Sequence, residues 1–461
     1  MAIDKDLKAS IAVTRFGLGA SAGEISHARA WPEDFLLAQI RAQGADPTSA
    51  DAAGSIARVR ELLDYQQERK TALQAGDPKA DPVQVAAKMI RADAGADFLA
   101  RVRLAAVTNT AFRERWALFW ANHFTVSANK LATATLVGPF EAEAIRPHVF
   151  GRFENLLVAS SSHPAMLIYL DQAQSIGPDS AAAAVQSRAG KHVGLNENLA
   201  REIMELHTVG VDAAYSQADV TEFARAMTGW SIAGEREPEP LRGRFIFRER
   251  AHEPGARTIM GRNYAEEGQG QALAVMRDLA RSPHTAHHIA YKLGRHFVAD
   301  DPPAALTARL EHAYLSTDGD LGKLARQLIA SPEAWDPEPR KFKTPYEFMV
   351  SSWRAAGVVP DKLEVVAPVM TAMGQKPFSA PSPKGWSETA QDWCAPDAIV
   401  KRMAWSEALA EESSADRDPG QLAAAALGAR LTPAVAKAVA RAETRAEGLS
   451  ILLMSPEFQR R

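Results

Sequence analysis

Apolar residues recur at helical spacing along most of the chain, with charged residues between them. The pattern is clearest from Ser55 to Lys70 and from Ala86 to Phe124, where apolar positions return with a period of about 3.6 residues. Further helices are predicted at 196–207, 217–228, 271–281, 284–298 and 321–330. The sequence therefore predicts a mainly α fold, a large multi-helix globular body.

One segment has the alternation of β-strands instead. Between Gly243 and Gly261 the residues RFIFRER alternate weakly, AHEPGA predicts a turn, and RTIMG predicts a returning strand. We expect this β-hairpin to be an insertion packed on the helical body, because an isolated hairpin is only marginally stable. No linker clearly separates domains, so residues 1–461 are predicted to form a single large domain. The alternative is that the N-terminal helical region, residues 1–85, forms a separate lobe.

Three stretches are predicted to be loops. Residues 75–82 (AGDPKADP) indicate a surface linker, and the small residues of 175–194 indicate a flexible surface loop. The Pro-rich stretch 376–386 is expected to be an ordered loop held by its two aromatic residues. Helices are predicted to stop at the Ser-Pro pairs 331–332 and 455–456, because proline cannot continue a helix without losing a hydrogen bond.

Composition and charge exclude several classes of function. Of the 461 residues, 46% are apolar and 24% are charged, as expected for a globular protein with a sizeable core. The formal net charge of −3 gives no basic field that would hold nucleic acid, so nucleic acid is not a predicted partner. Cys394 is the only cysteine, which excludes an internal disulfide and a multi-thiolate metal site.

The sequence also bears on location. No apolar run approaches the roughly 20 residues that a membrane-spanning helix needs. The N-terminal residues lack the basic head and apolar core of a secretory signal. We therefore expect no membrane span and a cytoplasmic protein, with an exported form as the alternative if a leader has been removed.

The most informative polar residues lie between Gly194 and Val211. On an α-helix, four of them share one arc: Asn198, Arg201, Glu202 and Glu205. Glu202 and Glu205 would face a metal ion or a substrate together, as helical carboxylates do in bundle metal sites. Glu202 and His207 would point about 140° apart on an undistorted helix, so one ion is not expected to bind both. The alternative is a solvated face on which Arg201 pairs with Glu205.

A second candidate is the aromatic segment 116–127. Helical spacing puts four of its side chains on one face: Trp116, Phe119, Trp120 and His123. One interpretation is a pocket wall in which Asn122 or His123 contacts a ligand, since aromatic pockets with few polar groups are typical of small-molecule sites. The other is an aromatic core with one hydrogen-bonded histidine.

Familiar catalytic and nucleotide-binding motifs are absent. The sequence has no GxxxxGK[ST] phosphate loop, no GxSxG nucleophile elbow and no kinase or dinucleotide fingerprint. His284 and His288 have the i, i+4 spacing of a zinc-binding pair, but no HExxH glutamate lies between them. We expect an exposed histidine pair there.

Several segments together resemble the bacterial family known as domain of unknown function 1800. They are Arg15–Gly19 (RFGLG), Phe119–Phe124 (FWANHF), His163–Leu167 with Leu170-Asp171, Asn196–His207 (NENLAREIMELH), Gln217–Val220 leading to Thr228-Gly-Trp230, Lys292–Phe297 (KLGRHF), Lys343-Thr-Pro345, Gly385-Trp386 and Ser455–Phe458 (SPEF). The resemblance runs from about residue 10 to the end, but it implies no assigned activity. Family members often carry secretion leaders. Gln172 and Glu253 stand where the family pattern has Asn and Asp, and both keep a polar group.

Polar residues inside apolar helices cost free energy unless they are paired, so these residues indicate either a site or a structural network. The leading hypothesis is an uncharacterised enzyme of hydrolase type. Its catalytic residues would be Glu202, Glu205, His123 and Arg201. The two carboxylates would act as general acid and base or as ligands of one divalent metal ion.

The substrate, a small molecule or a polymer, would contact Asn122, Trp120, Arg295 and Trp230. Two alternatives stay open. One is a non-catalytic scaffold or partner-binding protein, in which these residues form a buried polar network. The other is a glycan-active enzyme that uses the paired carboxylates.

Overall fold

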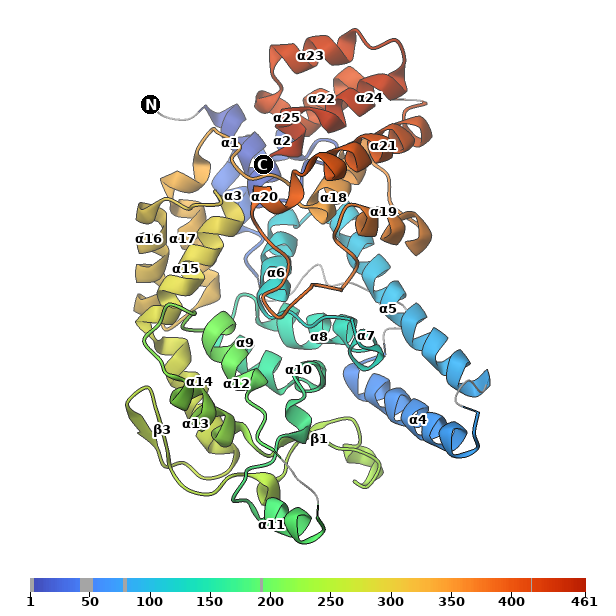
Figure 1. Cartoon of the computed structure of the whole chain (residues 1–461). Coiled ribbons are helices and arrows are strands. Elements are labelled where there is room, and N and C mark those ends of the chain that lie inside the picture. Colours follow the sequence, from blue (N-terminus) through green and yellow to red (C-terminus); the bar gives the residue numbers. More distant parts are fainter. Residues whose placement is uncertain (1–3, 42–52, 78–80, 191–193, 416) are drawn as a thin grey trace.

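The structure is a computed structural model that describes residues 4–41, 53–77, 81–190, 194–415 and 417–461. Helices make up most of the described chain, and the strands form two small antiparallel sheets (Figure 1). The prediction of a mainly α protein with a small β insertion is confirmed. None of the described helices has the length and apolar character that crossing a membrane requires.

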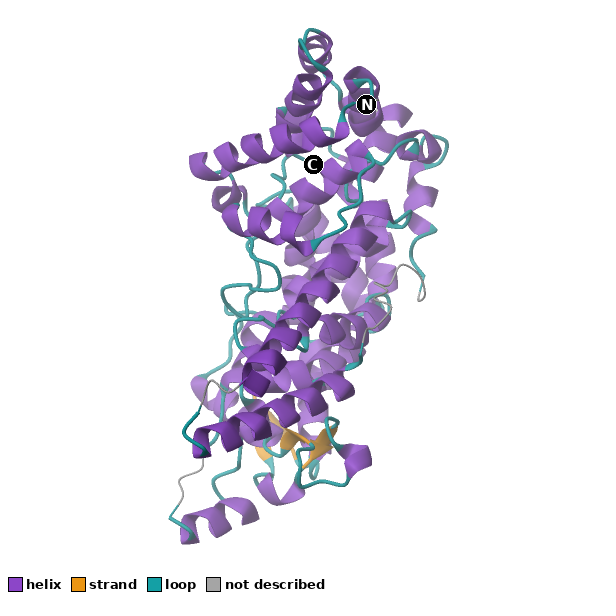
Figure 2. Ribbon diagram, turned by 90° about the vertical axis from the view of Figure 1, so that its right-hand side faces the viewer, coloured by secondary structure: helices purple, strands orange, loops and turns teal. Residues whose placement is uncertain are grey.

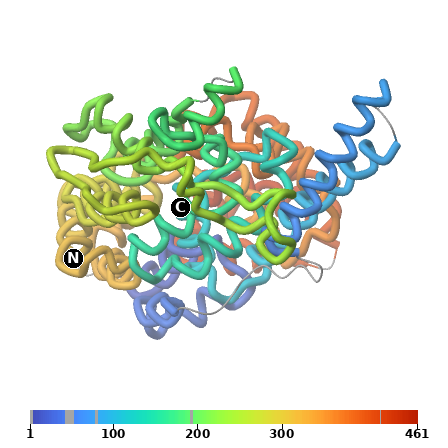
Figure 3. Tube along the Cα trace, turned by 90° about the horizontal axis from the view of Figure 1, so that it is seen from below, coloured from blue at the N-terminus to red at the C-terminus, as the bar shows by residue number. Residues whose placement is uncertain are grey.

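The chain starts with short helices and continues into a long helical hairpin. The short elements are α1 (Lys5–Ile11), the π-helix η1 (Ala12–Phe16), α2 (Glu24–Ala28) and α3 (Pro32–Leu37). The hairpin consists of α4 (Ser55–Gln74) and α5 (Asp81–Val107), and the end formed by the last turns of α4 and the first turns of α5 projects from the rest of the molecule (Figures 1 and 3). The predicted helix at 55–70 is confirmed. Of the predicted linker 75–82, residues 75–77 follow α4, the last two residues begin α5, and 78–80 lie outside the described residues.

Helix α6 (Ala111–His123) lies near the centre of the molecule (Figure 1). Its aromatic side chains are buried, and its polar side chains Arg113, Glu114 and Arg115 are buried too, so it is enclosed on all sides. The elements that follow are α7 (Leu131–Ala134), α8 (Val137–Phe140), the π-helix η2 (Glu141–Ile145), η3 (Arg146–His148), α9 (Phe153–Ser162), α10 (Pro164–Tyr169) and η4 (Gln172–Gln174).

The region predicted as a flexible loop, 175–194, contains helix α11 (Ala181–Arg188), so that prediction is wrong. The Ser180 side chain caps this helix by accepting a hydrogen bond from the Ala183 N–H, and a run of alanines has the highest helix propensity. Residues 191–193 of the predicted loop lie outside the described residues.

The predicted helix 196–207 is present in two parts, α12 (Asn198–Glu202) and the π-helix η5 (Ile203–His207). Helix α13 (Gln217–Met227) follows and confirms the prediction for 217–228. A capping box starts α13, because the Ser216 and Asp219 side chains each accept a hydrogen bond from the other's backbone N–H.

The β-structure differs from the predicted single hairpin. Strand β1 (Trp230–Ile232) pairs with β2 (Phe245–Phe247), and β3 (Arg257–Ile259) pairs with β4 (Arg262–Tyr264). The predicted pairing of RFIF with RTIMG within 243–261 is therefore wrong. Met260 and Gly261 both have positive φ, 49° and 76°, the backbone of a two-residue turn that closes β3 onto β4. The strands lie far from both termini (Figure 2).

The second half of the chain is helical again. Its α-helices are α14 (Gln269–Arg281), α15 (Pro283–Phe297), α16 (Ala304–Ser316), α17 (Leu321–Ala330), α18 (Pro345–Ala356), α19 (Ala367–Ala372), α20 (Ala390–Trp393), α21 (Pro396–Ser413), α22 (Pro419–Leu427), α23 (Pro433–Ala440), α24 (Arg445–Met454) and α25 (Pro456–Gln459). Short 3-10 turns are η6 (Glu239–Leu241), η7 (Glu249–Ala251), η8 (Pro332–Trp335), η9 (Leu363–Val365) and η10 (Gly428–Arg430). Helices α14, α15 and α17 confirm their predictions. Helices α17 and α24 end at the two Ser-Pro pairs, as predicted.

The described residues form two large apolar cores. One contains the aromatic residues of α6 together with residues of α9 to α17, and the other is built mainly by α5, α18 and α21 to α24. Phe378 packs against both cores, so the segment that carries it lies along the seam between them. We call this segment, residues 375–388 between α19 and α20, the strap.

The strap has no regular secondary structure, yet it is tied down at several points. The Ala128 N–H donates to the Phe378 carbonyl at 2.7 Å, and the Ser127 hydroxyl donates to the Ala380 carbonyl at 2.9 Å. At Gly385, φ is 84° and a Cβ would lie 2.4 Å from the Asn122 carbonyl oxygen, so only glycine fits. The predicted loop 376–386 is thus present and held in place.

Candidate functional site

A lysine on α15 lies at the centre of the most unusual polar cluster. His288, Lys292 and His296 follow one another at intervals of four residues, so they share one face of the helix. The opposite face is apolar and buried, with Ile289 and Leu293 in the large core. Amphipathic packing of α15 therefore turns the three basic side chains toward α6, η5 and the strap.

The Lys292 amine is hydrogen-bonded to an imidazole. Its Nζ lies 2.9 Å from His123 Nδ1, and His123 Nε2 lies 3.1 Å from the carbonyl oxygen of His207. A carbonyl oxygen only accepts hydrogen bonds, so Nε2 of His123 carries the proton. In the neutral imidazole Nδ1 is then the acceptor, and Lys292 donates to it. The His207 carbonyl fixes the tautomer through which His123 holds the lysine.

No acidic side chain in the described part of the chain pairs directly with Lys292, although the lysine is partly buried. Burial lowers the pKa of Lys292 to about 8; Glu388 opposes this shift, whereas Lys384 and Arg295 add to it. At neutral pH a fraction of order one tenth of the side chain is then the free amine. A free amine accepts a proton or attacks an electrophile, and an ammonium does neither.

The surrounding histidines are held neutral. Burial, followed by the charge of Lys292, lowers the pKa of His123 well below its usual value, that of His207 to about 3 and that of His288 to about 4. The His288 ring donates from Nε2 to the Leu206 carbonyl at 3.1 Å. Both ring nitrogens of His207 are buried without a hydrogen-bond partner among the described residues. The centre thus contains neutral imidazoles around one amine.

The π-helix η5 changes the geometry that sequence analysis assumed for this region. A π-turn closes i to i+5, so residues five apart come closer to the same side than on an α-helix. The predicted separation of Glu202 and His207 assumed an undistorted α-helix, and that assumption is wrong. The wide turn places His207 in the core, where its carbonyl accepts the hydrogen bond from His123.

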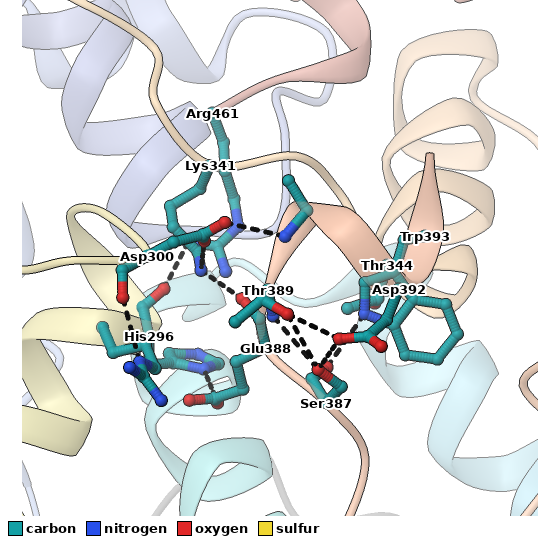
Figure 4. A network of polar contacts seen from close by, with 12 residues as sticks. His296, Asp300, Lys341, Thr344, Ser387, Glu388, Thr389, Asp392, Trp393 and Arg461 are labelled. Carbon is teal, nitrogen blue, oxygen red and sulfur yellow. Dashed lines mark hydrogen bonds and ion pairs between the residues drawn. The ribbon is translucent and has the colours of Figure 1, made fainter. Parts of the chain in front are cut away.

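A second polar network adjoins the lysine centre on the strap side (Figure 4). His296 Nδ1 donates to Glu388 Oε1. Lys341 Nζ donates to Asp300 Oδ1 and to the backbone carbonyl of Glu388. Asp300 Oδ2 in turn accepts from the Ala390 N–H at 2.7 Å. These contacts fix the C-terminal end of the strap against α15, and the charge of the Glu388 carboxylate acts on Lys292.

A cavity of about 80 Å³ opens beneath the strap, next to this network. Charged and aromatic side chains line it: Arg101, Arg115, His296, Glu347, Trp386 and Arg461. A neighbouring cavity of about 60 Å³ shares Arg101, Asn122 and Trp386 with it. The second network therefore adjoins this space through His296 and Glu388, whereas Lys292 and His123 are not among the residues that line it.

Of the residues predicted to be catalytic, only His123 belongs to this cluster. Arg201 pairs with Glu205 at 3.3 Å and with Glu197 at 3.0 Å, so the pair predicted for a solvated face is present. Glu202 is partly buried on the same helix, and burial followed by the Glu205 charge raises its pKa. The two carboxylates line none of the cavities described above.

The residues predicted to contact substrate have different surroundings. Asn122 lines both cavities, but its side chain is fully engaged with Trp386: Nδ2 donates to the carbonyl at 3.0 Å and Oδ1 accepts from the N–H at 2.7 Å. Trp120 and Trp230 are completely buried. Arg295 donates to the Asp300 carbonyl and to the Tyr291 hydroxyl.

No three His, Cys, Asp or Glu side chains within the described ranges are arranged to hold a metal ion. The predicted divalent-metal site at Glu202 and Glu205 therefore gains no third ligand from the described residues, and it stays a prediction. Sequence analysis missed Lys292 and Glu388. The spacing of His288, Lys292 and His296 could have indicated the first, whereas nothing local indicates the second.

Fold and site together define a mainly α-helical protein with a lysine and histidine centre against the aromatic residues of α6. The chain belongs to the family described as "Protein of unknown function (DUF1800)", whose model matches residues 11–460. The resemblance stated from the sequence motifs is thereby confirmed over nearly the whole chain. No curated protein and no solved structure matches it.

Proposed function

We propose that the protein is a hydrolase in which the amine of Lys292, oriented by His123, is the general base. The observation that carries this proposal is the 2.9 Å contact between Lys292 Nζ and His123 Nδ1, made without an acidic partner for the lysine. A lysine that serves only stability is expected to be ion-paired or exposed, because an unpaired internal charge costs free energy.

The chemistry follows from the protonation states. A neutral Lys292 amine takes a proton from a water molecule and makes it a nucleophile, and the resulting ammonium then returns a proton to the leaving group. A pKa of about 8 suits both steps at neutral pH, because either form is accessible. His123 keeps the amine in place, and His207 holds His123 in the required tautomer.

The first test measures the reactivity of Lys292 itself. Acetylation by a small anhydride, followed residue by residue with mass spectrometry over a pH series, reports when each lysine loses its proton. We expect a midpoint near pH 8 for Lys292, and its profile is compared with that of the exposed Lys130. Identical profiles for the two lysines would remove the basis of the proposal.

The second test measures activity on a panel of activated esters, amides and phosphate esters. Loss of a general base is expected to reduce hydrolysis by a factor of about 10² to 10⁴, so Lys292→Met should lose that much. Lys292→Arg should be equally inactive because arginine does not deprotonate, whereas Lys130→Met should keep parent activity. Equal rates for parent and Lys292→Met on every cleaved substrate would favour the non-catalytic scaffold instead.

A second candidate function is carboxylate chemistry on α12, favoured by the raised pKa of Glu202. It covers the metal-dependent and glycan-active hypotheses. Its test is the Glu202→Gln/Glu205→Gln double variant, with divalent metal content and glycosidase activity measured beside the parent. A bound metal or an activity that disappears in the folded double variant would move the active site from Lys292 to α12.

A further inference from the structure

The cavity beneath the strap is lined by more positive than negative charge. Three basic side chains line it, Arg101, Arg115 and Arg461, with two acidic ones, Glu347 and Glu388. Arg101 has a separate acidic partner in Glu141. Arg115 and Arg461 are therefore the cavity's basic groups with the fewest acidic partners.

One carboxylate serves two arginines at the wall of this cavity. Glu347 Oε1 pairs with Arg115 and, at 2.8 Å, with Arg461. The remaining Arg115 bond is from Nε to the Gly17 carbonyl, so its Nη2 makes no hydrogen bond to the described residues. Arg461 is 2% exposed, and its Nε is buried without a hydrogen-bond partner among the described residues. Two guanidinium groups thus retain unused donors.

The basic groups also show mutual repulsion. Burial, followed by the nearby charge of Arg461, lowers the pKa of Arg115 to about 10 and also lowers the pKa of Lys341. Burial and the charge of Arg430 lower the pKa of Lys343. A further negative charge inside the cavity would relieve this repulsion, and a further positive charge would increase it.

We propose that this cavity binds the anionic group of the substrate, a carboxylate or a phosphate, through Arg115 and Arg461. Arginine is suited to this, because its planar donors match both groups. About 80 Å³ admits one such group with little else, so the rest of the ligand extends outside it. The inference rests on the proposed function only for the role of the anion in the reaction; the binding itself is independent of it.

The position of the cavity links it to the lysine centre. His296 lines the cavity and lies one helical turn beyond Lys292 on α15. Its partner Glu388 also lines the cavity and is the acidic side chain whose charge acts on Lys292. A ligand anchored at Arg115 and Arg461 would therefore lie beside the His296–Glu388 pair that joins the cavity to α15 (Figure 4 shows Arg461, His296 and Glu388).

The experiment uses four small probes on the intact protein at constant ionic strength: inorganic phosphate, acetate, methylphosphonate and acetamide. Binding is followed by Tm and by tryptophan fluorescence, with Trp386→Phe to assign the signal to the cavity wall. We expect saturable binding of the anions and none of acetamide, the uncharged analogue of acetate. Comparison of acetate with phosphate and methylphosphonate tells whether a carboxylate or a phosphate fits better.

The matched variants are Arg461→Gln and Arg340→Gln, which remove the same charge from the cavity and from the exposed surface. Loss of charge-assisted hydrogen bonds should weaken anion binding by about tenfold or more in Arg461→Gln and leave it unchanged in Arg340→Gln. Equal binding by the parent and a folded Arg461→Gln, or equal effects of acetate and acetamide on the parent, would overturn the proposal. The acetamide comparison needs no variant and so decides even if Arg461→Gln fails to fold.

Lys292→Met separates this proposal from the proposed function. We expect anion binding to persist in this variant, weakened only by the loss of the Lys292 charge, since Lys292 is not one of the anchoring groups. Anion binding that survives while Lys292 titrates as an ordinary lysine would refute the general base and keep the anion site. Hydrolysis that depends on Lys292, without any anion binding, would keep the general base and refute the anion site.

Discussion

Replacing Lys292 with methionine tests whether the site disfavours charge, because methionine keeps an unbranched chain and removes the amine. Burial lowers the pKa of Lys292 from 10.5 to about 8. The difference corresponds to about 3 kcal/mol between the charged and neutral forms of the folded protein, at about 1.4 kcal/mol per pKa unit. That is a large effect beside a typical stability of about 5–15 kcal/mol.

The sign follows from proton binding in the two states. Between pH 8 and 10.5 the unfolded chain still holds the Lys292 proton and the folded protein has released it, so the stability of the parent rises with pH in this window. Below pH 8 the folded protein also holds the proton, so the full free-energy cost of the buried charge lowers the stability of the parent. Lys292→Met lacks this dependence of stability on pH. It also leaves His123 Nδ1 without its hydrogen-bond donor, which costs about 1–3 kcal/mol of stability at every pH in this window.

We therefore expect Lys292→Met to be as stable as the parent at pH 7, or more stable by up to about 2 kcal/mol, because the two terms oppose each other. From pH 7 to pH 10.5 the difference should shift toward the parent by about 3 kcal/mol. Urea unfolding at a series of pH values measures it, with Lys130→Met as the exposed control. Parallel pH profiles for parent and Lys292→Met would refute the reasoning, since they would show an ordinary lysine.

Three further predictions concern the supports of the site. Asn122→Ala should cost about 1–3 kcal/mol and speed hydrogen exchange across the strap, because both backbone groups of Trp386 lose their partner. Arg146→Met should cost about 3–5 kcal/mol in chemical unfolding, since it leaves the buried carboxylate Glu114 without its guanidinium and Glu141 with Arg101 alone. In the parent, the raised pKa of Glu202 makes stability fall as pH rises above its ordinary value of 4.5; Glu202→Gln should abolish that fall, which acid-range unfolding curves would show.

Most of the helical fold could be predicted because its signals are local. The helices at 217–228, 271–281, 284–298 and 321–330 each show apolar periodicity and a clear start or stop, and all four are present. The failures came from weaker local signals. The alanines of 181–184 form a helix with Ser180 as its cap, although a stretch of small residues also suits a flexible loop.

The strands show a different limit. RFIF and RTIMG were the two β-like stretches in one segment, so pairing them was the simplest interpretation. The actual partners, β1 and β4, are three residues long and have no alternation of their own. The two-residue turn at Met260 and Gly261 pairs β3 with β4. The sequence does not indicate this turn, because Met is not a residue typical of a positive-φ turn position.

The site could be predicted only in part, for a physical reason. His123 was identified because it extends an aromatic helix face, and that face is buried as expected. Lys292 was not identified as a site residue, because a lysine beside the apolar face of an amphipathic helix is usually solvated. What distinguishes it is its surroundings, contributed by residues 85 to 169 positions away in the sequence. The π-turn before His207 also has no local signature that the sequence analysis used.

The two halves of the site should be electrically coupled, because they share His296 and Glu388. An anion in the cavity stabilises nearby positive charge, so it should raise the pKa of Lys292 above about 8 and draw a proton from solution as it binds. Such uptake would raise the protonated fraction of Lys292 in the complex, so its action as a general base should need a higher pH with the anion bound than without it. Calorimetric titration of acetate in two buffers of different ionisation enthalpy at pH 8 measures the uptake, and identical heats would show that cavity and lysine act independently.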